Sequence, residues 1–132
     1  MGNQFAIVDA YVPTAVYYEL ADSVEYMRED APCVQRRIDD HLTLAWNLDR
    51  SKVIGFRLKG FRNFFLRELQ PTCSFLDSEF LSLVYVVEKV CESLAAQLGA
   101  EAFDEDRKKA YNLVHKIAQE DCARLSSLPK AA

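Results

Sequence analysis

The chain has 132 residues, of which 50% are hydrophobic and 27% are charged, and its formal net charge is −4. This length suits one domain with a sizeable core, and the composition is that of an ordinary globular protein rather than a generic polyanion binder. No apolar run approaches the ~20 residues that span a bilayer, and the start MGNQFAIVDAYV lacks the features of a signal peptide. We therefore expect a cytoplasmic protein with no membrane association.

Short strands are predicted near the start of the chain, where β-branched and aromatic residues alternate. The first covers residues 15–20 and is entered from Pro13, the second covers residues 24–28, and the third covers residues 33–38. The third strand leads into a tight turn at Asp39-Asp40.

Residues 36–61 carry the strongest pattern. Apolar residues alternate with others at residues 42–46 and again at residues 54–58, on either side of a polar turn at residues 47–51. This predicts a β-hairpin with one buried face, to which Ile54 contributes. Because the strands follow one another through short links, an antiparallel meander of four or five strands is the simplest topology.

After residue 60 the hydrophobic period becomes that of helices. The spacing of Phe61, Phe64, Phe65 and Leu69 predicts a short helix that ends before Pro71.

A long helix is predicted over residues 77–98, with Asp77 or Ser78 as its cap and Gly99 at its end. Its apolar stripe consists of Phe80, Leu83, Val84, Val87, Val90, Cys91, Leu94 and Leu98.

A last helix is predicted to begin near Asp104 and to end before Pro129. Its stripe runs to Leu125 and Leu128, and Asp121 interrupts it, so we expect imperfect burial there. The pattern predicts one α+β domain over residues 1–132. An antiparallel β-meander at residues 9–61 precedes a short helix and a C-terminal helical hairpin packed on the sheet, at residues 62–128.

The densest ionisable cluster is Asp39-Asp40-His41, where neighbouring carboxylates and a histidine could hold a metal or supply a base. Adjacent residues on a strand point to opposite faces, so the three cannot all converge, and the turn chemistry of aspartate explains the pair. Asp49 could approach this cluster or lie at the other end of the hairpin. We expect His115 to be a solvated or helix-flanking histidine rather than a ligand.

No nucleophile motif, glycine-rich phosphate loop or CxxC pair occurs. The four cysteines, Cys33, Cys73, Cys91 and Cys122, are expected to be reduced thiols, with Cys91 in the core. The sequence therefore predicts a protein that is not an enzyme and has no cofactor and no metal.

Residues 50–67 carry basic residues and no acidic one, interleaved with phenylalanines. Such a stretch could contact nucleic acid, although its phenylalanines have core spacing. A solvated face or an acidic protein partner is the favoured explanation. The candidate contact residues are Arg50, Lys52, Arg57, Lys59, Arg62 and Arg67.

The long predicted helix has apolar residues beyond one stripe, at Leu81, Tyr85 and Val86. A helix with so wide an apolar surface should contact its own sheet and, in addition, either the last helix or another subunit. In the second case these residues form a candidate dimer face. We therefore expect a homodimer.

The strand region, at residues 9–61, resembles the YuzE-like family of small bacterial domains of unknown function. The residues that carry the resemblance are Tyr11, Pro13, Asp39, Asp40, Asp49, Ile54 and Gly55. The chain departs from the family at His41, where a glycine usually completes the turn, and in its long helical half. The family has no established enzymatic activity, and some members are thought to lie beside small toxin-like proteins. The resemblance thus implies an accessory or antitoxin-like partner of another small protein.

Overall fold

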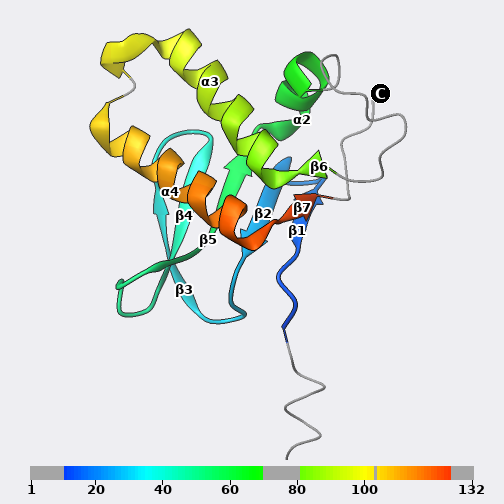
Figure 1. The fold of residues 1–132 in the computed structure, drawn as a ribbon, viewed down its shortest axis with the longest axis vertical. Helices are drawn as coiled ribbons and strands as arrows, with labels where there is room; N and C mark the ends of the chain where they lie inside the picture. Colours follow the sequence, from blue (N-terminus) through cyan, green and yellow to red (C-terminus); the bar gives the residue numbers. More distant parts are fainter. Residues whose placement is uncertain (1–10, 70–80, 103, 126–132) are drawn as a thin grey trace, which may run out of the picture.

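The computed structural model describes residues 11–69, 81–102 and 104–125. Its strands are β1 (Ala15–Tyr18), β2 (Ser23–Met27), β3 (Cys33–Arg37), β4 (Leu42–Asn47), β5 (Val53–Lys59), β6 (Leu81–Ser82) and β7 (Arg124–Leu125). Its helices are α2 (Phe61–Phe64), η1 (Phe65–Leu69), α3 (Leu83–Ala102) and α4 (Glu105–Asp121). The pair α3 and α4 crosses one face of the sheet (Figure 1). The predicted α+β class is confirmed.

The strand order in the sheet is β3-β4-β5-β2-β1-β7-β6. The predicted hairpins β1–β2, β3–β4 and β4–β5 are confirmed, but β2 pairs with β5 and not with β3, so a simple sequential meander is wrong. The apolar residues of β2 and β5 match across this pairing, with Tyr26 opposite Phe56 and their ring centroids 6.0 Å apart. Alternation indicates which face a strand buries, whereas these side-chain contacts decide which strand lies beside it.

A β-bulge interrupts the central hairpin. Ala45 pairs with Gly55 and Trp46 pairs with Val53, so Ile54 is the extra residue. Beyond the bulge the two faces exchange, and Val53 joins the main core while Ile54 is buried outside it. The prediction that Ile54 shares a face with the core residues of β5 is therefore wrong.

The prediction of one buried face also fails in part. On the face without helices Thr43 is only 8% exposed, because long side chains from the neighbouring strands, including Met27, Gln35 and Arg57, surround it. Burial therefore does not alternate strictly along β4.

The short helix predicted after residue 60 is confirmed, and its second half is π-helical. Gly60 has a φ of 68° and turns the chain out of β5. Phe61, Phe65 and Leu69 are buried against the core. The predicted end before Pro71 lies outside the described residues.

The long helix begins at Leu83, and Leu81–Ser82 form strand β6, so the predicted helical start is wrong. Leu83 donates its N–H to the carbonyl of Ala123 at 2.9 Å, which joins the helix start to the chain beside β7. The candidate caps Asp77 and Ser78, and Phe80, lie outside the described residues. Gly99 has a φ of 82° and breaks the helix at the predicted position.

Helix α4 begins as predicted, with the Asp104 side chain accepting from the N–H of Arg107 at 3.0 Å. It ends at Asp121, however, because Cys122 adopts a left-handed conformation and Leu125 enters β7 beside β1. The prediction that the helix continues is therefore wrong for residues 122–125. Leu128 lies outside the described residues. Within the described part, no helix is long and apolar enough to cross a bilayer.

Asp121 anchors the end of α4 to the sheet. Its carboxylate accepts the hydroxyl of Tyr26 at 2.7 Å and two guanidinium N–H groups of Arg28 at 2.8 and 2.7 Å. Glu120 also accepts from Arg28, at 3.0 Å. The hydrogen bonds from Arg28 hold the pKa of Asp121 below its ordinary value of 3.8. The residue that interrupts the apolar stripe is thus a polar connection between α4 and β2.

Replacing Asp121 with Asn should lower the free energy of unfolding at neutral pH by about 2 kcal/mol, since hydrogen bonds to a charged group are lost. Because the folded carboxyl has a lowered pKa, its contribution is complete above the ordinary value and disappears as the pH falls below it. The difference between wild type and variant should therefore shrink below about pH 4 in urea unfolding. Glu120→Gln is the matched control, with a smaller effect because Glu120 is more exposed. Equal effects of both variants would contradict the anchoring role.

Gly55 should not tolerate a side chain. A Cβ atom there would contact the Sδ of Met27 and lie 2.5 Å from the backbone oxygen of Tyr26. We expect Gly55→Ala to lower the free energy of unfolding by about 1–3 kcal/mol, because strands β2 and β5 must separate. Adding Met27→Ala should restore only part of this loss, since the backbone contact remains. Full recovery in thermal unfolding would show that Met27 alone sets the requirement.

Candidate functional site

The Asp39 carboxylate organises the turn between β3 and β4. Its side chain is only 5% exposed, and Oδ1 accepts the N–H groups of His41 and Leu42 at 2.8 Å each. Tyr111 of α4 donates its hydroxyl to Oδ2 at 3.0 Å, and Arg107 Nε lies 3.7 Å from the same oxygen. Burial and the neighbouring carboxylate raise the pKa of Tyr111, so its hydroxyl remains a donor. The turn interpretation of Asp39 is confirmed.

The other members of this cluster point elsewhere, as the alternation predicts. Asp40 forms an ion pair with Arg37, and Nδ1 of His41 lies 3.4 Å from the carbonyl oxygen of Lys59. Asp49 lies at the opposite end of the hairpin, where it accepts the N–H of Ser51 at 2.9 Å. The carboxylates and His41 therefore do not form one site, and the described residues contain no group of three or more side chains suited to a metal.

The remaining histidine and the thiols also have ordinary surroundings. His115 is half-buried, and its Nε2 lies 2.8 Å from Glu88 Oε1 of α3. Cys33, Cys91 and Cys122 are free, and Cys91 packs against the core as predicted. Cys73 lies outside the described residues.

The basic stretch is divided among several elements. Arg50 is in the β4–β5 turn, Arg57 and Lys59 are in β5, and Arg62 and Arg67 follow in α2 and η1. Three of the candidate residues have acidic partners, in the pairs Lys52–Glu29 at 2.5 Å, Arg57–Glu25 at 3.3 Å and Arg67–Glu68 at 3.5 Å. The ion pairs reduce the positive charge that the sequence suggested.

The candidate dimer face is wrong at Val86, which is 0% exposed and belongs to the core of this chain. Tyr85 is half-buried, and the ammonium of Lys89 lies 5.5 Å from the centroid of its ring. Leu81 is in β6, where it pairs with Leu125. At Val86, therefore, the additional apolar surface of α3 packs into the core of the same chain.

Strand β3 forms one outer edge of the sheet among the described residues. Ile38 donates its N–H to the carbonyl of Leu42 at 2.9 Å. This bond shows which residues of β3 direct their N–H and C=O groups toward β4 and which direct them away. In an antiparallel pair every second residue directs its N–H and C=O away from the partner strand. Here the outward residues are Cys33, Gln35 and Arg37.

A hollow of about 240 Å³ lies beside this edge, with Trp46, Arg36 and Arg50 among its lining residues and no carboxylate. Arg36 and Arg50 are exposed, and neither has an ion-pair partner in the described part of the chain. The indole Nε1 of Trp46 is buried without an acceptor among these residues. Arg50 has a φ of 59°, a conformation that is uncommon for residues other than glycine.

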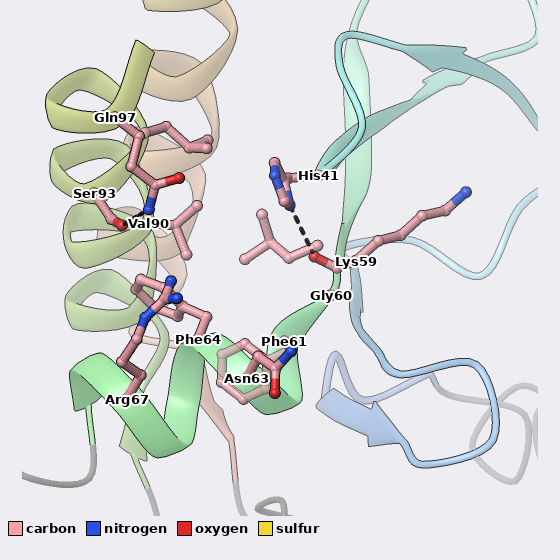
Figure 2. Close-up of a pocket in the computed structure, with 12 residues that line it drawn as sticks. His41, Lys59, Gly60, Phe61, Asn63, Phe64, Arg67, Val90, Ser93 and Gln97 are labelled. Carbon is pink, nitrogen blue, oxygen red and sulfur yellow. Dashed lines mark hydrogen bonds between the residues drawn. The ribbon is translucent and has the colours of Figure 1, made fainter. Parts of the chain in front are cut away.

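A second hollow, of about 280 Å³, lies between α3, the α2–η1 segment and the end of β5. Figure 2 shows His41 on the sheet side and Ser93 and Gln97 on the α3 side, with Arg67 rising from η1 on the α3 side as well. The Lys59 side chain points away from α3 in the same view.

Neither hollow could be recognised from the sequence alone. Arg36 and Trp46 are ten residues apart, and they meet only because the β3–β4 register places Trp46 opposite Val34. The available signal in the sequence was a tryptophan among the aliphatic residues of the hairpin, next to a turn that contains an arginine. His41 and Gln97 lie even further apart in the chain.

Comparisons with known proteins add no relative. No protein-family model matches the chain, and no curated protein and no solved structure matches it. The resemblance to the YuzE-like family therefore stays a prediction.

The two aspartates of the turn should differ sharply in their effect on stability. We expect Asp39→Ala to lower the free energy of unfolding by about 2 kcal/mol or more, because it leaves buried donors without an acceptor. Asp40→Ala should change it by less than about 0.5 kcal/mol, since the Arg37–Asp40 pair is exposed. Thermal unfolding of both variants measures the difference. A large effect of Asp40→Ala with none for Asp39→Ala would contradict the assigned roles.

Proposed function

We propose that this protein is a non-catalytic interaction module that binds an extended, acidic segment of a partner protein along the outer edge of β3. The observation that carries the proposal is an outer sheet edge beside two arginines that have no ion-pair partner and a tryptophan whose buried N–H has no acceptor, all judged within the described residues. The partner segment adds a strand to the sheet, as in other cases of β-augmentation.

The backbone of β3 supplies affinity that does not depend on side chains. Cys33, Gln35 and Arg37 direct their peptide groups outward, and a peptide in register satisfies them. Alternate side chains of that peptide point to the side on which Arg36 and Trp46 lie. Those side chains determine which sequences bind.

Charge selects an acidic segment. Arg36 and Arg50 line the hollow and no lining residue is acidic, so a glutamate or aspartate of the partner there gains charge-assisted hydrogen bonds. Arginine on an edge strand also guards against aggregation, and that role accounts for Arg36 alone. It does not account for Arg50, which lies in the turn, or for the Trp46 N–H without an acceptor. The same arginines disfavour basic partners, which is the repulsive element that specificity requires.

Several predictions from the sequence fit this proposal. A small acidic partner agrees with the accessory or antitoxin-like role that the family resemblance implies. The free thiols agree with a cytoplasmic location. The homodimer stays a prediction, and the β3 edge favours it less than a different partner, because a second copy would bring its own Arg36 and Arg50 to the shared edge.

Nucleic-acid binding through residues 50–67 is less well supported. Several basic residues of this stretch are in ion pairs, and Phe56, Phe61 and Phe65 are buried and cannot stack on bases.

Fluorescence of Trp46, the single tryptophan of the chain, tests the proposal. The probe is a six-residue peptide that alternates valine and glutamate, and its controls are the same peptide with lysine for glutamate and a block arrangement of the same residues. We expect saturable binding of the alternating acidic peptide alone. The variant with Arg36→Glu and Arg50→Glu should weaken it by about tenfold or more, since charge-assisted contacts become repulsive.

The matched control is Lys109→Glu, a charge reversal on the exposed side of α4, which should leave the affinity unchanged. Equal binding of the acidic and lysine peptides would overturn the proposal. Equal losses of peptide affinity in the control and in the double variant would also overturn it, because binding would then depend only on the net charge of the protein.

A further inference from the structure

The hollow between α3, the α2–η1 segment and the end of β5 shares no lining residue with the hollow beside β3. Its volume of about 280 Å³ is near the lower limit for small-molecule sites. At about 30 Å³ for each water-sized group, it holds a molecule of roughly ten non-hydrogen atoms. Phe61, Phe64, Val90 and Leu94 contribute its apolar lining.

Polar groups gather on the walls of this hollow. His41 approaches from the β3–β4 turn, and its Nδ1 lies 3.4 Å from Lys59 O, so a ring that donates there leaves Nε2 for another partner. On the opposite wall Gln97 donates to Ser93 Oγ at 2.9 Å, so the pair presents fixed polar groups (Figure 2).

The charges that line the hollow are positive. Arg67 is among the lining residues, and none of the lining residues is acidic. Lys59 also lines the hollow, but its side chain points away from α3 (Figure 2), so Arg67 supplies the positive charge. Arg67 has Glu68 as its partner, with Nε 3.5 Å from Oε1, but the two side chains are 64% and 43% exposed. Such an exposed pair is weak, so Arg67 can exchange this partner for a ligand without a large cost.

Two lining segments of the hollow have uncommon backbone conformations. Arg67 is in the π-helical turn η1, and π-helical turns occur frequently at functional sites. Gly60 has a positive φ, and a Cβ atom there would lie 3.6 Å from Nδ1 of His41, so a side chain would narrow the space beside that ring.

We infer that this hollow binds a small carboxylate with a compact apolar body, whose carboxylate faces Arg67 and whose body lies against the apolar lining. Arg67 supplies the charge, and the amide and hydroxyl groups of α3 orient the ligand. This site is additional to the β3 edge and does not depend on it.

The probe for this inference is phenylacetate, with phenylacetamide as a neutral molecule of the same shape and phenylethylamine as a cation. In an NMR titration of the full chain, phenylacetate should shift the backbone amides of Gly60, Asn63 and Ser93 with a Kd of about 1 mM, as expected for so small a ligand. The amide should bind more weakly, and the amine should not bind.

Two variants make the test specific. Arg67→Ala should weaken phenylacetate binding by about tenfold and leave phenylacetamide unchanged, because only the charged contact is lost. Ser93→Leu should abolish binding of both, because its side chain fills the hollow. Arg36→Ala, at the separate β3 edge, is the matched arginine control and should change neither titration.

Equal affinity for phenylacetate and phenylacetamide would overturn the inference, as would an unchanged phenylacetate titration in Arg67→Ala. Shifts that map away from the lining residues would do the same. None of these results affects the peptide experiment at β3, so the two proposals fail separately.

Discussion

The position of helix α4 depends on two carboxylates that lie at its opposite ends. Near its start, Tyr111 and Arg107 of the helix meet Asp39 of the β3–β4 turn, and at its end Asp121 meets Tyr26 and Arg28 of β2. Each carboxylate accepts a hydrogen bond from a tyrosine hydroxyl and lies beside a guanidinium group, so these polar groups have partners. The apolar face of α4 is non-directional, whereas these two connections fix where along the sheet it lies. With α4 and its partner α3 held on one face, the edge of β3 remains uncovered in the described part of the chain.

Much of the fold could be predicted because local patterns were strong. The central hairpin, the phenylalanine spacing after residue 60 and the break at Gly99 each follow from period or from the backbone needs of one residue. The errors arise where long-range contacts decide. Strand β2 lies beside β5 because of Tyr26 and Phe56, and the chain after Asp121 leaves the helix because β1 offers it a place in the sheet. One extra residue at Ile54 exchanges two faces, and no alternation rule reveals it.

The candidate sites were less accessible to prediction than the fold. The sequence drew attention to Asp39-Asp40-His41 and to residues 50–67, since both are dense in charge. The structure uses Asp39 as a turn and helix anchor and pairs Arg57 with Glu25. Among the described residues, two arginines without an ion-pair partner line one hollow: Arg36, which lies ahead of the basic stretch, and Arg50, which belongs to it. Only the strand register brings these two residues together. Density of charge along a chain is therefore a poorer guide than the absence of a partner in space.

Hydrogen exchange along β3 tests the central claim, that this edge is open and binds an acidic strand. In the free protein the amides of Gln35 and Arg37 should exchange quickly, while those of Val34 and Arg36, which face β4, should be protected. When the alternating acidic peptide is bound, Gln35 and Arg37 should become protected and the other two should change little. Protection of all four amides in the free protein would contradict an open edge. Protection by the peptide at any other strand, with none at β3, would contradict the proposed binding mode.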